Sequence, residues 1–176
     1  FTGNEAGDDG HGGAIFMYSE GSGYTGYQSI YIGDIATFTS NIAGGAGGAI
    51  YMYSDSDNGD TGNQRIYIVG DATFEGNEAY DDGGAIYMAS DASDNTGYQR
   101  IDIDGDATFI GNTAGSDGGA IYMYSDSDND DTGYQRIYIG GDATFEGNEA
   151  YDDGGAIFMY SEGSGYTGYQ SIYIGD

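Results

Sequence analysis

Residues 47–58 read GGAIYMYSDSDN: a pair of glycines, an alternating apolar segment and an acidic end. Variants of this stretch occur five times in 176 residues, with Gly-Gly pairs that begin at Gly12, Gly47, Gly83, Gly118 and Gly154. The copies therefore follow one another every 35 or 36 residues. A fixed period of this length is typical of solenoids, propellers and other repeat arrays.

Each unit contains three short segments with the alternation of strands, which in the second unit are residues 36–41, 47–54 and 63–70. Alternation turns Ile50 and Met52 to the same side, and all five methionines of the chain occupy the Met52 slot. Such a column is what a packed interior requires. The sequence thus predicts an all-β fold, a right-handed parallel β-helix with 35–36 residues and three short strands per turn.

A propeller fits less well, because its blades usually carry four strands. A solenoid with two turns per unit is a further alternative, but three strands do not divide evenly between two turns. We expect a single array over residues 1–176, with repeats at about 1–35, 36–71, 72–106, 107–142 and 143–176. The run Gly12–Asp34 returns unchanged at Gly154–Asp176. Neither end has the polar cap that an isolated solenoid needs, so we expect this chain to be a window of a longer array.

Two amide columns are in phase with the repeat and are expected to form structural ladders, each side chain bonding its copy one turn away. The asparagines are Asn4, Asn41, Asn77, Asn112 and Asn148. The glutamines are Gln28, Gln64, Gln99, Gln135 and Gln170.

Composition narrows the function. With 30 acidic residues, three arginines and no lysine, the net charge of −27 argues against binding to nucleic acid or an anionic membrane surface. No apolar run approaches the length of a membrane span, so we expect no membrane insertion of this segment. Repeats offer ladders rather than one distinctive catalytic constellation, and the single histidine, His11, has no nucleophile beside it. We therefore expect that the chain is not an enzyme. A β-helical polysaccharide lyase, an enzyme class with this fold, would need one distinctive group of catalytic residues.

Outward aromatic residues are expected to form a strip two residues wide, here called the contact face. Its members are Phe16, Tyr18, Tyr51, Tyr53, Tyr87, Tyr122, Tyr124, Phe158 and Tyr160. Stacked tyrosines can serve only to stabilise the sheet, through contacts between neighbouring strands. An exposed apolar strip can also serve as a lateral contact between fibres or as a platform for sugar rings.

Acidic loops follow the GGAI strands, and stacking brings their like charges about one turn apart, which calls for counterions. Candidate metal ligands are Asp55, Asp57, Asp60, Asp91, Asp94, Asp126, Asp128, Asp130 and Asp131. Asp126, Asp128 and Asp130 mimic the start of an EF-hand loop, but Ile137 stands where the bidentate Glu belongs. Calcium or magnesium shared between rungs would relieve this repulsion, with Ca²⁺ as the expected cofactor, and the alternative is an acidic surface adapted to high salt. Arg65, Arg100 and Arg136 are expected to form salt bridges with neighbouring loops.

The repeated pair FxxN and GGAI, present in all five units, resembles the repeats of the chlamydial polymorphic outer membrane proteins. In that family such repeats build a β-helical passenger that is exported to the cell surface and is linked to adhesion. The resemblance therefore implies a surface-exposed β-helix. This chain departs from the family in lacking cysteine and in its acidity.

Two functions remain open. The first is a secreted or cell-surface structural fibre, which would self-associate into fibres or bundles. The second is an adhesin stalk that binds a receptor or glycan through its aromatic face. Both place the chain outside the cell or on its surface, and a high-salt environment would suit the charge.

Overall fold

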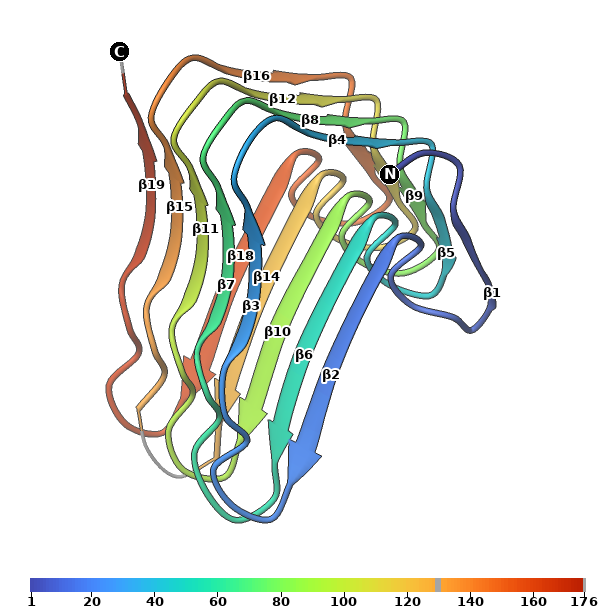
Figure 1. The fold of residues 1–176 in the computed structure, drawn as a ribbon. Coiled ribbons are helices and arrows are strands. Elements are labelled where there is room, and N and C mark those ends of the chain that lie inside the picture. Colours follow the sequence, from blue (N-terminus) through green and yellow to red (C-terminus); the bar gives the residue numbers. More distant parts are fainter. Residues whose placement is uncertain (129–130, 176) are drawn as a thin grey trace.

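A computed structural model describes residues 1–128 and 131–175 of the chain as an all-β solenoid. Four parallel sheets run along it, and each sheet takes one strand from every turn that it covers. Figure 1 shows the turns stacked in sequence order, with the N-terminal and C-terminal turns at opposite ends. The predicted parallel β-helix is confirmed, and no helix in the described part of the chain is long and apolar enough to cross a membrane.

Two large sheets carry the features discussed below. The methionine sheet contains the five GGAI strands, β2 (Ile15–Gly21), β6 (Ile50–Ser56), β10 (Ile86–Ala92), β14 (Ile121–Ser127) and β18 (Ile157–Gly163). The arginine sheet contains β3 (Gln28–Ile32), β7 (Gln64–Ile68), β11 (Gln99–Ile103), β15 (Gln135–Ile139) and β19 (Gln170–Ile174).

Two smaller sheets complete the turns. The phenylalanine sheet contains β4 (Ala36–Thr39), β8 (Ala72–Glu75), β12 (Ala107–Ile110) and β16 (Ala143–Glu146). The short-strand sheet contains β1 (Glu5–Asp8), β5 (Ile42–Gly44), β9 (Glu78–Ala79), β13 (Thr113–Ala114) and β17 (Glu149–Ala150).

One repeat makes one turn of the solenoid. Every strand pairs with its own copy in the next repeat, so that Met52 lies beside Met17 on one side and Met88 on the other. The same register holds in the arginine sheet, where Ile66 pairs with Ile30 and Ile101. This register excludes the alternative of two turns per unit. Each turn is called a rung below.

The turns contain four strands instead of the predicted three. The additional strand is the short one that follows each ladder asparagine, and its inward residue is an alanine, such as Ala43 or Ala79. Pairing of Ala43 with Ala79 is in register. The strand has two residues in three of the five rungs and no more than four in the others, which is too few to show an alternating pattern in a sequence, so it was missed.

The core consists of columns from three sheets. Phe38, Phe74 and Phe109 are fully buried, and their rings stack face to face with centroids 4.8 and 4.9 Å apart. Ile50 and Met52 of the methionine sheet meet Ile66 and Ile68 of the arginine sheet in the same cluster. The predicted inward positions are therefore confirmed, and the two large sheets enclose the core, with their outer faces turned away from each other.

The Gly-Gly pair shapes the sharp turn into each methionine-sheet strand. Gly47 has a φ of 71°, which is a conformation that favours glycine. At Gly48 a Cβ would lie 2.0 Å from the carbonyl oxygen of Gly84 in the next rung. The first glycine thus supplies the backbone conformation, and the second allows the rungs to approach.

Candidate functional site

The asparagine column forms a continuous ladder. In the middle of it, Asn77 donates from Nδ2 to Asn112 Oδ1 at 2.9 Å and to the Phe38 carbonyl at 3.0 Å. Its own Oδ1 accepts from the backbone N–H and the side chain of Asn41, at 3.1 and 2.8 Å. The amide of Asn77 is fully buried and has all four of these bonds, so the ladder fixes the corner between the phenylalanine and short-strand sheets.

The glutamine column forms a second ladder that ties two sheets together. Gln99 Nε2 donates to Gln64 Oε1 at 3.1 Å, along the ladder. It also donates to Ser90 Oγ at 3.1 Å and to the Tyr124 carbonyl at 2.7 Å, both in the methionine sheet. The bonds across the interior hold the two large sheets together near their loops.

The first column of the contact face is stacked; its inner rings are largely covered, whereas Phe16 in the first rung is 53% exposed. Centroid distances from Phe16 through Phe158 lie between 4.9 and 5.1 Å. Tyr51 and Tyr122 nevertheless keep only 7% and 9% of their surface exposed. In the first rung His11 shows how the cover arises: it stacks on Tyr51 at 4.6 Å and accepts a hydrogen bond from the Ala46 N–H. The turn before the first GGAI strand therefore covers the ring of Tyr51, and burial raises the pKa of Tyr51 to about 12.

The second column of the contact face is exposed at both ends. Tyr18 and Tyr160 are 47% and 43% exposed. Tyr18 stacks on Tyr53 with centroids 5.7 Å apart, and Tyr124 stacks on Tyr160 at 5.8 Å. Ala89 interrupts the column in the third rung and is fully buried. The open part of the contact face is thus narrower than the sequence indicated.

Beside this column lies an acidic column that carries one carboxylate in every rung: Glu20, Asp55, Asp91, Asp126 and Glu162. Tyrosine hydroxyls donate to three of them, as from Tyr18 to Glu20 at 2.7 Å. The hydrogen bond to Glu20 raises the pKa of Tyr18 to about 12. Burial and the neighbouring carboxylates raise the pKa values of Asp55 and Asp91 above the usual aspartate range.

The remaining candidate metal ligands lie in the loops below these strands. Asp60 Oδ1 accepts from the backbone N–H and the side chain of Asn95, both at 3.0 Å, and the Asp131 N–H donates to Asn95 Oδ1 at 3.3 Å. Asp57 and Asp128 are exposed at the strand ends, Asp94 lies in the loop after β10, and Asp130 falls outside the described residues. Within residues 1–128 and 131–175, no group of three acidic or histidine side chains is placed to hold a metal ion.

A threonine column also orders these loops. Thr61 Oγ1 accepts from the Gly97 N–H at 3.0 Å, and Thr96 Oγ1 accepts from the Gly133 N–H at 2.8 Å. The Thr-Gly pair recurs in every unit, so the signal for this ladder was available in the sequence.

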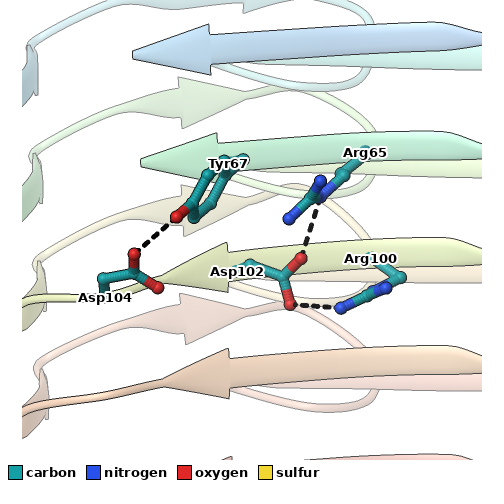
Figure 2. A network of polar contacts seen from close by, with 5 residues as sticks. All are labelled: Arg65, Tyr67, Arg100, Asp102 and Asp104. Carbon is teal, nitrogen blue, oxygen red and sulfur yellow. Dashed lines mark hydrogen bonds and ion pairs between the residues drawn. The ribbon is translucent and has the colours of Figure 1, made fainter. Parts of the chain in front are cut away.

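On the arginine sheet, Asp102 bridges two rungs (Figure 2). Its carboxylate lies 2.9 Å from Arg65 Nε and 3.1 Å from Arg100 Nη2, and its side chain is only 5% exposed. We expected the partners of the arginines in neighbouring loops, but this carboxylate comes from the sheet itself, at a position where other rungs have tyrosine. Tyr67 lies beside it, with its ring under Arg65 and its hydroxyl donating to Asp104 at 2.6 Å.

A second tyrosine column, which was missed from the sequence, flanks the arginines. Tyr98 stacks on Tyr134 at 5.1 Å, and Tyr134 stacks on Tyr169 at 5.6 Å. Together with Arg100, Arg136 and Ser171 they line a groove of about 480 Å³ on the outer face of the arginine sheet. The column directly precedes the ladder glutamines, and alternation places it outward, so the signal was present.

The comparison with known families bears on the fold and the surface. The Chlamydia polymorphic membrane protein repeat matches residues 36–53, 71–89, 106–124 and 142–159. The chain carries polymorphic membrane protein repeats. Each matched segment covers a phenylalanine-sheet strand, the asparagine corner and the first part of a GGAI strand. Neither the curated proteins nor the solved structures contain a match to this chain.

The polymorphic membrane protein repeats on a β-solenoid fit a surface repeat protein. The matched segments end before the acidic column and do not reach the arginine sheet. The acidic and arginine columns are therefore features of this chain outside the part that matches the repeat family.

Proposed function

We propose that this chain is a structural β-solenoid of the cell surface or extracellular space, which associates into fibres or bundles. The observation that carries the proposal is the in-register pairing of successive repeats in the methionine and arginine sheets, which places the outward residues of these strands in columns along the solenoid axis. A column presents the same chemistry at each rung. Such a surface is suited to contacts that extend along a neighbouring fibre, because every added repeat adds the same contact.

The contact face supplies the apolar part of this association. Its second column forms two pairs of stacked rings beside the acidic column, Tyr18 with Tyr53 and Tyr124 with Tyr160, separated by Ala89. Aromatic residues with an apolar body and a polar tip are frequent at protein interfaces. We propose a structural rather than a catalytic role, because the recurring columns provide repeated contacts and no single reactive constellation.

Divalent cations, with Ca²⁺ as the first candidate, are proposed to reduce the repulsion within the acidic column and its loops. The raised pKa values of Asp55 and Asp91 support this, since neighbouring carboxylates contribute to both shifts. Binding would require the carboxylates to turn toward one another, because the described side chains do not form a three-ligand group as they lie. A high-salt environment would provide the same relief by screening.

The alternative is an adhesin stalk that binds a receptor or glycan through its aromatic face. The match to polymorphic membrane protein repeats favours this alternative, given the resemblance to exported, adhesion-linked passengers. A stalk would remain discrete in the absence of its target, whereas a fibre protein assembles without any partner.

Negative-stain electron microscopy of the native material, with and without a calcium chelator, separates these functions. The fibre proposal predicts long uniform filaments, and fraying under the chelator would assign divalent cations to the acidic columns. Short discrete rods tethered to cells, whose length does not change when the protein concentration is raised, would contradict the fibre proposal. They would favour the adhesin stalk.

A further inference from the structure

We propose that the outer face of the arginine sheet is a docking surface for the acidic column of a second copy of this chain. This inference rests on the proposed structural function and names the surfaces that meet in lateral association. It concerns residues outside the segments that match the repeat family.

All three arginines of the lysine-free chain lie in one column. Arg65, Arg100 and Arg136 are neighbours in successive rungs of the arginine sheet. The side chains of Arg65 and Arg100 are 42% and 39% exposed, even though both pair with Asp102. The chain therefore gathers its scarce positive charge on one accessible face.

The single carboxylate of Asp102 does not neutralise this column. It faces Arg65 and Arg100, whereas the guanidinium of Arg136 lies over the Tyr138 ring at 4.9 Å. Among the residues that the structure describes, Arg136 has no carboxylate partner. The groove between Arg100, Arg136 and the Tyr98–Tyr134–Tyr169 column can therefore accept a further anionic group.

The tyrosines of this groove favour an anion over a stacked sugar ring. Tyr98, Tyr134 and Tyr169 are stacked on one another, so the ring faces between them are already occupied. What they offer to a ligand is their ring edges and hydroxyl groups, beside the donors of the guanidinium fork. These groups suit carboxylates, which arginine can bind with two parallel hydrogen bonds.

The acidic column of another copy provides carboxylates at the required spacing. Glu20, Asp55, Asp91, Asp126 and Glu162 follow one another at one per rung, and those of them in β6, β10 and β14 are partly exposed. Within the described residues none of them is paired with a cation. Two copies of one solenoid have the same rung spacing, so several arginines can meet several carboxylates when the axes lie side by side.

The location of the two columns determines the type of assembly. They lie on the outer faces of the two large sheets, which enclose the core between them and point away from each other. When the arginine face of one copy binds the acidic column of the next, the first copy still has a free acidic column and the second still has a free arginine face. Because the two faces point away from each other, we expect this heterologous contact to extend into open rows of parallel or antiparallel solenoids and not to close into a ring.

Two variants of the full chain isolate the faces. The basic-face variant changes Arg65, Arg100 and Arg136 to Ser, as found at Ser29 and Ser171, and Asp102 to Tyr, so that no buried carboxylate is left unpaired. The acidic-face variant changes Glu20 and Glu162 to Gln and Asp55, Asp91 and Asp126 to Asn. Circular dichroism establishes that each variant keeps the β-solenoid.

Sedimentation velocity at about 0.15 M salt, where the Debye length is about 8 Å, measures association. Wild-type chains are expected to form open-ended oligomers, and each variant alone is expected to associate more weakly by about tenfold or more. Mixed in equal amounts, the variants should form discrete one-to-one pairs, because each retains the face that the other has lost.

A matched control changes Glu5, Asp9, Asp34, Glu75 and Glu146 to amides, which removes five exposed acids elsewhere. It should associate at least as well as the wild type, because only general repulsion is reduced. A basic-face variant that associates like the wild type, or a mixture that stays monomeric, would overturn the proposal. A wild-type monomer that binds polygalacturonate through its arginines would also overturn it and assign the groove to an anionic glycan.

The association of the variants and the electron microscopy of native filaments test different statements, so either can fail without the other. Filaments whose lateral association is unchanged in the basic-face variant would overturn the docking surface and leave the proposed function standing. Discrete rods in electron microscopy would contradict the proposed function itself.

Discussion

The buried amide of Asn77 is the clearest single-residue determinant of the coil. Its four hydrogen bonds link three rungs, reaching Asn41 and Phe38 on one side and Asn112 on the other. A buried amide is costly unless it is fully bonded, and the ladder satisfies each asparagine with its neighbour. Because an asparagine recurs at this position in every rung, each buried amide finds its hydrogen-bond partners in the neighbouring rungs.

Replacing Asn77 by Ala should lower the free energy of unfolding by roughly 3 kcal/mol, because buried groups on both neighbouring rungs lose their partners. Chemical denaturation monitored by circular dichroism provides the measurement. Asn4→Ala is the matched control: Asn4 is exposed in the first rung, where water can replace the lost bonds. Equal losses in the two variants would show that the ladder does not contribute through burial.

At the scale of a strand, in-register stacking has the opposite effect on charged residues. Asp91 lies between Asp55 and Asp126 in the acidic column, and all three carboxylates point outward from adjacent strands. Burial is the main cause that raises the pKa of Asp91, followed by the charges of Asp126, Asp55 and Asp128. The register that satisfies amides thus concentrates like charges.

The raised pKa of Asp91 predicts a pH dependence of stability. The folded chain binds a proton at this site at a higher pH than the unfolded chain, so folding takes up protons. Stability should therefore increase as pH falls from 7 toward the ordinary aspartate value of 3.8. Asp91→Asn removes the penalty and should raise the melting temperature at pH 7, with less gain at lower pH.

Thermal unfolding between pH 4 and 8 tests this expectation. Asp34→Asn removes one charge from an exposed loop and serves as the control for the net charge of −27. The melting temperature should rise more for Asp91→Asn than for Asp34→Asn at pH 7. If Asp91→Asn lowers the melting temperature at neutral pH, the charged form of Asp91 does not destabilise the folded chain, and the expectation is wrong.

The elements also show what a single sequence can and cannot predict. The columns of Met52, Phe38 and Gln64 were predicted because each recurs at the same place in the repeat, and recurrence itself indicates stacking. The short strands were missed because two to four residues are too few to show alternation. The burial of Tyr51 depends on the path of the preceding turn, which alternation within a strand does not determine.

The site residues divide in the same way. Asp102 could be recognised as a break in a tyrosine column, but its contacts with Arg65 and Arg100 depend on side-chain directions between rungs. The acidic column was partly recognised as loop aspartates. Its continuity through Glu20 and Glu162 became apparent only when the strands were placed side by side.

At the scale of the whole molecule, stacking makes the solenoid both long and uniform along its sides. The repeat family accounts for the phenylalanine strands, the asparagine corner and the GGAI turns. The acidic column and the arginine face are added to that framework on the outer faces of the two large sheets. The framework sets the rung spacing, and the added columns determine which charged groups the sides of the solenoid present.

The central claim is that one repeat forms one rung, and that the stack of rungs runs along the axis of the proposed fibre. Diffraction from aligned native filaments tests it most directly. The structure predicts a reflection at about 4.8 Å parallel to the filament axis, from strands that lie perpendicular to it. A 4.8 Å reflection perpendicular to the axis, or filaments without this spacing, would contradict the claim.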